Sequence, residues 1–104
     1  LCHGFQIHVT DPFLFNPYYL TLKLIQAVME NHRTDFQYKA PPYEYELKRR
    51  PIDLIIGDRD IRRRIENLES VDTVATSWRP ALKAFIETSR PYLLYEPSCH
   101  REIR

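Results

Sequence analysis

Three stretches of the chain carry apolar residues at spacings of three and four, and this periodicity constrains the fold more than any other feature. It predicts helices near residues 17–32, 58–68 and 71–88, each with an apolar stripe that must be buried. Asn16 and Pro17 begin the first helix, because Asn caps free backbone N–H groups and Pro lacks the N–H that the first turn leaves unpaired. Pro80 is expected to kink the third helix.

Shorter segments alternate apolar and polar residues, which is the period of a β-strand. In residues 4–10, Phe5, Ile7 and Val9 share one face, and polar side chains share the other. This segment is therefore expected to be a half-buried strand. Two more segments are expected to be short strands: 35–39 and 92–95.

The expected fold class is α+β, with a small, mostly antiparallel sheet covered by about three helices. Residues 51–57 fit either a buried strand or a short helical turn, and their pattern does not decide between the two. Residues 1–104 are expected to form a single domain. The expected core is Phe5, Ile7, Val9, Leu20, Leu24, Val28, Ile61, Ile65, Trp78, Leu82, Phe85 and Leu94.

The charge balance excludes several classes of partner. Lys and Arg number 15 against 14 Asp and Glu, a net charge of +1, so no nucleic acid or anionic membrane is expected as a partner. No apolar run approaches the roughly 20 residues of a membrane-spanning helix. The arginine run of residues 59–64 has acidic neighbours, which predicts a solvated face with ion pairs rather than a phosphate site. Because Leu1 is not an initiator Met, we expect a fragment of a longer protein.

Cysteine and histidine occur together near both ends of the chain. Cys2-His3 and Cys99-His100 supply the ligand types of a zinc site, but adjacent residues in an extended chain point in opposite directions. We therefore expect no metal and no cofactor. Two free thiols are the simplest expectation, and a disulfide between Cys2 and Cys99 stays open. No nucleophile motif or phosphate-binding glycine loop is present, so no catalytic residue is assigned.

Two groups of polar residues are candidates for a binding surface. His8 and Asp11 lie at the polar edge of the first predicted strand, and either line a cleft or form a solvated outer face. Tyr43, Glu44 and Tyr45 follow two prolines that stiffen the backbone. Aromatic faces stack on sugar rings and carboxylates accept hydrogen bonds from hydroxyls, although the tyrosines fit packing on the core equally well. Four carboxylates are candidates to converge: Asp11, Glu44, Glu46 and Asp53.

Four motifs together resemble a known family. They are residues 5–11 (FQIHVTD), 41–46 (PPYEYE), 51–54 (PIDL) with Gly57, and 91–95 (PYLLY). In this order they resemble the C-terminal region of the NamZ-type exo-β-N-acetylmuramidases, a bacterial family long catalogued as one of unknown function. The resemblance spans essentially the whole chain, and four ordered motifs are more specific than any one of them.

The resemblance implies a function that this chain does not perform alone. In that family, an N-terminal Rossmann-like domain bears the catalytic carboxylates, and a C-terminal α+β domain completes a cleft that removes terminal N-acetylmuramic acid from peptidoglycan fragments. It implies an extracytoplasmic location and a Rossmann-like partner domain in the same parent chain. The expected substrate-binding residues are His8, Asp11, Tyr43, Glu44 and Tyr45. The alternative is a structural or protein-interaction module without a ligand of its own.

Overall fold

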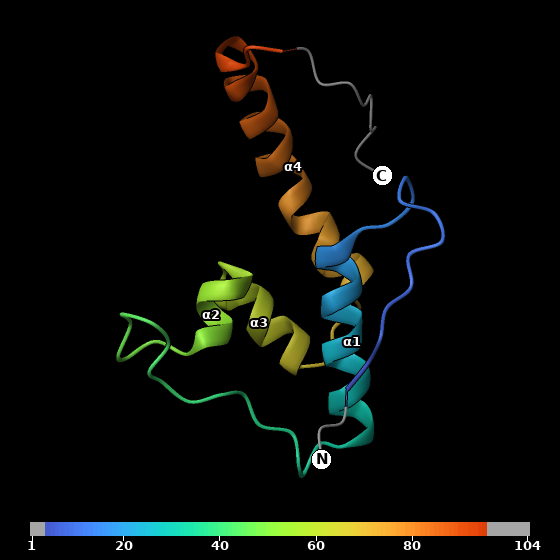
Figure 1. The fold of residues 1–104 in the computed structure, drawn as a ribbon, viewed down its shortest axis with the longest axis vertical. Coiled ribbons are helices and arrows are strands. Elements are labelled where there is room, and N and C mark those ends of the chain that lie inside the picture. The colour runs from blue at the N-terminus through green and yellow to red at the C-terminus, as the bar shows by residue number, and fades with distance from the viewer. Residues whose placement is uncertain (1–3, 96–104) are drawn as a thin grey trace.

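The computed structural model describes residues 4–95, and in this range the secondary structure is helical. In Figure 1, α3 and the start of α4 lie against α1, and α2 lies beside α3, while the second half of α4 extends away from the other helices. The elements are α1 (Pro17–Asn31), α2 (Pro51–Ile56), α3 (Arg59–Glu66), α4 (Val71–Ser89) and the short 3₁₀ helix η1 (Arg90–Tyr92). The three predicted helices are therefore confirmed, and the undecided segment 51–57 contains the helix α2.

Local sequence signals account for where the helices begin and end. The Asn16 side chain accepts a hydrogen bond from the backbone N–H of Tyr19, and Pro17 occupies the first turn of α1. Asp58 caps α3 by accepting from the backbone N–H groups of Asp60 and Ile61. Gly57, with φ of 81°, ends α2 in the left-handed conformation that glycine adopts without strain.

The core is small and lies where α1, α3 and α4 meet. Leu22, Ile65, Val71 and Val74 are fully buried, and each contributes about 1.5–3 kcal/mol of hydrophobic stabilisation. Ile61 completes the buried cluster. Partly buried side chains pack around it: Tyr19, Ile25, Ile56 and Trp78.

Polar contacts fix α1 against the start of α4. The hydroxyl of Tyr19 donates to the carboxylate of Asp72 (2.6 Å), which also accepts from the Lys23 ammonium (3.2 Å). The Gln26 side chain is buried and donates to the backbone carbonyl of Glu69 (2.5 Å). The bond from Gln26 satisfies a buried amide that would otherwise be costly to bury, whereas the contacts of Asp72 lie at the exposed surface.

The expected antiparallel sheet is wrong for the residues that the structure describes. Their one β-bridge joins Tyr43 and Glu46. Residues 4–10 follow an irregular exposed path, in which Phe5 is 76% exposed and no backbone hydrogen bond to another described residue is made. Alternating side chains make a segment compatible with a strand, but the strand forms only when a neighbouring chain takes up its backbone hydrogen bonds. Residues 35–39 form no strand either, and η1 covers the start of the third predicted strand.

The predicted core is corrected in the same way. Ile61 and Ile65 are buried, and Leu20, Leu24, Val28 and Trp78 are half-buried. The side chains at the two ends of the chain and on the second half of α4 are exposed instead: Phe5, Ile7, Val9, Leu82, Phe85 and Leu94.

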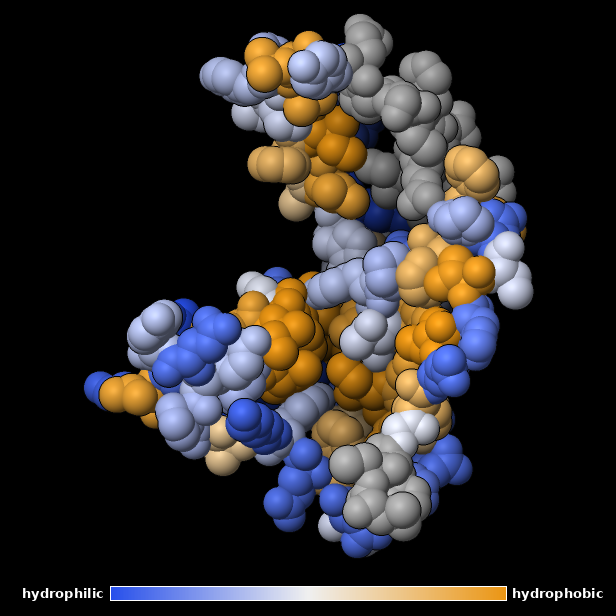
Figure 2. All heavy atoms as spheres, viewed as in Figure 1, coloured by the Kyte–Doolittle hydropathy of each residue, from blue (hydrophilic) through white to orange (hydrophobic). Residues whose placement is uncertain are grey.

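Within residues 4–95, no helix other than the adjoining η1 packs on the second half of α4, although its sequence is amphipathic. Phe85 is 67% exposed, and Leu82 and Ile86 are exposed beside it. Figure 2 shows hydrophobic residues facing a hollow between this half of α4 and the α2–α3 pair. A cavity of about 480 Å³ lies there, lined by Asn16, Tyr18, Ile61, Trp78, Ala81 and Leu82. Pro80 lies inside α4, and the helix continues through it to Ser89.

Candidate functional site

The loop between α1 and α2 is held in a defined shape by its own backbone. The N–H of Tyr43 donates to the carbonyl of Glu46 (2.9 Å), and the N–H of Glu46 donates to the carbonyl of Tyr43 (3.0 Å). The two bonds close a tight turn with Glu44 and Tyr45 at its tip. Tyr45 is 98% exposed, whereas Tyr43 is half-buried. The loop therefore presents one aromatic ring and one carboxylate to solvent.

Glu44 has a backbone conformation that is unusual for its residue type. Its φ of 52° lies in the left-handed region, which costs a residue with a Cβ about 1 kcal/mol or more. The tight turn accounts for this conformation, since a positive φ is common at the centre of such turns. Residues held in this way occur disproportionately at binding sites.

Glu46 fixes the loop to the residues that follow it. Its carboxylate accepts hydrogen bonds from the backbone N–H groups of Lys48 (2.8 Å) and Arg49 (3.1 Å), and from Nε of Arg49 (2.7 Å). The backbone bond from Lys48 and the two bonds from Arg49 stabilise the charged form and lower the pKa of Glu46 to about 2. Glu46 thus remains ionised at any physiological pH and serves to hold the loop.

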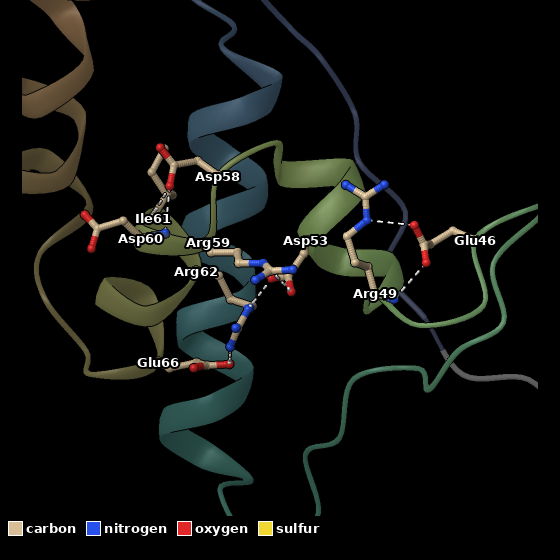
Figure 3. Close-up of polar contacts among 9 residues, drawn as sticks. All are labelled: Glu46, Arg49, Asp53, Asp58, Arg59, Asp60, Ile61, Arg62 and Glu66. Atoms are coloured by element: carbon tan, nitrogen blue, oxygen red, sulfur yellow. Dashed lines mark hydrogen bonds and ion pairs between the residues drawn. The ribbon is translucent and has the colours of Figure 1, made fainter.

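A buried ion-pair network lies behind the loop, between α2 and α3 (Figure 3). Nε of Arg62 donates to Oδ1 of Asp53, and its Nη1 donates to Oε1 of Glu66 (2.6 Å). Arg59 approaches the second oxygen of Asp53 at 3.8 Å. Arg62 is only 9% exposed, and its hydrogen bonds to Asp53 and Glu66 raise its pKa despite this burial. This network joins the two short helices that carry the end of the loop.

A cavity of about 440 Å³ adjoins the loop where it leaves α1. Residues 36–41, which follow α1, form most of its wall. The other lining residues are Met29 of α1, Arg50 just before α2, and Glu66 of α3. The rings of Phe36 and Tyr38 meet edge to face with centroids 4.9 Å apart. Burial is the main reason that the pKa of Tyr38 is raised, and the charge of Glu66 adds to the effect.

The structure brings together only some of the predicted site residues. Tyr43, Glu44 and Tyr45 lie in one turn, as their sequence proximity requires. His8 and Asp11 lie on the exposed N-terminal segment, on the other side of α1 from that turn (Figure 1). Asp11 accepts a hydrogen bond from the backbone N–H of Phe13 (2.8 Å).

The four carboxylates that are candidates to converge do not share one environment. They are Asp11, Glu44, Glu46 and Asp53. Glu46 and Asp53 are each bound by an arginine, so they do not form an acid–base pair with each other. Glu44 and Asp11 are exposed on separate segments. The sequence signal for the buried pair of Asp53 and Arg62 is a single acidic residue in the apolar run 52–56, followed by an arginine run.

Neither a metal-ligand cluster nor a membrane-spanning helix occurs among the described residues. Within residues 4–95, no three His, Cys, Asp or Glu side chains gather where they could hold a metal ion. The candidate ligands Cys2, His3, Cys99 and His100 lie outside this range. None of the helices that the structure describes combines the length and apolar character needed to cross a membrane.

Comparison with known proteins places the chain in a family. The family described as the C-terminal region of the exo-β-N-acetylmuramidase NamZ matches residues 1–95. The chain belongs to this NamZ C-terminal family. A curated relative, the peptidoglycan β-N-acetylmuramidase NamZ of Bacillus subtilis (strain 168), is 32% identical over 95 residues, which is 91% of this chain and 21% of the relative. No solved structure matches the chain.

The family assignment confirms the resemblance expected from the four sequence motifs, since the matched range contains all of them. The chain spans about a fifth of the length of the curated NamZ relative. Four-fifths of that enzyme therefore has no counterpart in these 104 residues.

Proposed function

We propose that this chain is the C-terminal accessory region of a peptidoglycan-degrading glycosidase of the exo-β-N-acetylmuramidase type, and that it is not catalytic alone. The family match over residues 1–95 carries this proposal. The relative's name describes a β-N-acetylmuramidase of peptidoglycan, and the matching part is a fifth of its length. The remaining part of such an enzyme would supply the catalytic acid and the nucleophile or base.

The loop of residues 43–46 would form one wall of the sugar cleft. Tyr45 offers an exposed aromatic face for stacking on a pyranose ring, and Glu44 offers a carboxylate for sugar hydroxyls. Because Glu46 holds the turn, both groups are positioned before the sugar arrives, which lowers the entropy cost of binding. His8 and Asp11 would contact the substrate or the partner domain from the N-terminal segment.

The proposed partner is an N-terminal Rossmann-like domain of the same parent chain, with a muropeptide or muramic-acid sugar held between the two parts. The coding sequence upstream of Leu1 tests this partner directly. We expect it to encode a Rossmann-like domain with acidic motifs, in a protein exported from the cytoplasm. An unrelated upstream sequence would contradict the proposal.

Kinetics of the longer protein test the role of the loop. We expect Tyr45→Ala, Tyr43→Phe and His8→Ala each to lower kcat/KM for release of N-acetylmuramic acid from a chromogenic muramide by about tenfold, the effect of one lost contact. Tyr92→Ala is the matched control, because this exposed tyrosine lies on η1 and away from the loop. Wild-type kcat/KM in all three folded variants would refute the site.

A second candidate function is a protein-interaction module without a ligand of its own. The exposed apolar side chains of α4 favour it, because a soluble domain rarely leaves Leu82, Phe85 and Ile86 together in water. A longer protein that keeps full activity after removal of residues 1–104 would support this alternative against an accessory role in catalysis.

A further inference from the structure

The cavity beside the loop has the dimensions of a small-ligand site. Its volume of about 440 Å³ lies within the range of about 300–1,000 Å³ that is usual for such sites. Met29 and Phe36 supply apolar surface, while Lys39, Arg50 and Glu66 supply charge. The predicted substrate-binding residues do not line it, so it is a separate feature of the same region.

The charges around this cavity favour an anion. Glu66 is already bound by Arg62, so its charge is compensated. Lys39 and Arg50 make no side-chain hydrogen bond or ion pair with any residue that the structure describes. Arg33, similarly unpaired within residues 4–95, lines a cavity of about 50 Å³ that shares Met29, Phe36 and Glu66 with the larger one. The cavity therefore carries uncompensated positive charge.

A second observation concerns Tyr38 in the cavity wall. Its hydroxyl oxygen is buried and has no hydrogen-bond partner among the described residues. Burial and the nearby Glu66 raise its pKa, so the hydroxyl stays protonated and is a donor. Buried polar groups in proteins are nearly always paired with protein, water or a ligand. The Tyr38 ring lines the cavity but its hydroxyl is shielded from it, so the two cations unpaired in the described part of the chain, Lys39 and Arg50, are the groups that favour a negatively charged ligand.

We propose that this cavity binds a carboxylate of the glycan, namely that of the lactyl group of N-acetylmuramic acid, through Lys39 and Arg50. The inference rests on the proposed function and names the part of the sugar that is recognised. N-acetylmuramic acid differs from N-acetylglucosamine by a lactyl ether, which ends in a carboxylate and carries a methyl group. The cations would contact the carboxylate, and Met29 and Phe36 would contact the methyl group. The pocket would thus distinguish the two sugars that alternate in peptidoglycan.

The test uses the 104-residue chain and its backbone amide NMR signals. We expect N-acetylmuramic acid at millimolar concentration to shift the signals of residues 36–41 and 50, and N-acetylglucosamine to bind more weakly. The double variant Lys39→Gln/Arg50→Gln should weaken muramic acid binding by about tenfold, because two exposed charge contacts together are worth about 1.4 kcal/mol. The control is Arg79→Gln/Lys83→Gln, which removes two exposed cations from α4 and should change nothing.

A third ligand separates the two sources of a carboxylate. In a muramyl dipeptide, the lactyl carboxylate is an amide and the free carboxylate lies on the peptide. We expect the dipeptide to bind as weakly as N-acetylglucosamine. Binding as tight as that of N-acetylmuramic acid would move the recognised carboxylate to the stem peptide and overturn the lactyl assignment.

The remaining outcomes separate this inference from the proposed function. Equal binding of both sugars, unchanged in the double variant, would overturn carboxylate recognition and leave sugar binding by the domain intact. Absence of shifts in residues 36–41 with either sugar would also overturn the inference. The kinetic effects of Tyr45→Ala and His8→Ala in the longer protein decide the proposed function independently of both results.

Discussion

Removing Arg62 should destabilise the fold far more than removing an exposed arginine of the same helix. Arg62 is 9% exposed and binds both Asp53 and Glu66, and the Asp53 side chain is itself 9% exposed. Arg62→Ala would leave a nearly buried carboxylate with only the distant Arg59 as a partner. Breaking one side of a buried ion pair costs about 3–5 kcal/mol. Because Glu66 is 29% exposed and can be hydrated, we expect a loss at the lower end of this range, about 3 kcal/mol.

Urea denaturation of the purified chain measures this loss as a lower midpoint at unchanged m-value. A loss of this size should also lower Tm by about 15 °C. Arg63→Ala is the control, because Arg63 is exposed on the same helix, and it should change stability by less than about 0.5 kcal/mol. The double variant Asp53→Asn/Arg62→Met should cost less than the sum of its two single variants, since the nearly buried carboxylate of Asp53 is removed together with its partner and only the more exposed Glu66 loses an ion pair. A loss below about 1 kcal/mol for Arg62→Ala would refute a stabilising role for the network.

Three further predictions concern single positions. Trp78→Ala should cost about 2 kcal/mol in urea denaturation, less than for a fully buried ring, because Trp78 is half-buried and meets Tyr18 edge to face at 5.4 Å. Gly57→Ala should cost about 1 kcal/mol because of its φ of 81°, and a Tm equal to that of the parent would contradict this. The Glu46 pKa of about 2 lies below its ordinary value of 4.5, so its contribution is present above pH 4.5 and is lost as the pH falls through about 2. NMR signals of Tyr45 should therefore keep their native shifts at about pH 4 and lose them near pH 2, whereas Glu46→Gln should lose them at neutral pH.

The helices could be predicted because their determinants are local. Leu20, Leu24 and Val28 repeat within one segment, and the capping role of Asn16 depends on a residue three positions away. The predicted sheet was wrong because strand pairing depends on distant residues. The alternation in residues 4–10 is real in the sequence, but nothing in it specifies a neighbouring strand.

The candidate site was predictable only in part, for a similar reason. The sequence placed Tyr43, Glu44 and Tyr45 on a stiff loop, and the prolines were the visible cause. The structure shows that Glu46 also holds this loop, through bonds to residues two and three positions later. The cavity lined by Lys39 and Arg50 arises because the loop passes over α1 and α3, and no local pattern reveals that approach.

The two halves of α4 should differ in the rate at which their amide hydrogens exchange with solvent. Val71, Val74 and Ala75 are packed in the core, so amides of the first half are released only when the whole domain unfolds. Pro80 removes one backbone donor from α4. The residues beyond it are exposed to solvent, and a helix of this length without tertiary packing opens readily. Protection against exchange should therefore fall steeply along one continuous helix. A molecule that binds the second half of α4 would slow amide exchange there and not in the first half. The exchange rates of individual residues would therefore show which part of α4 is bound.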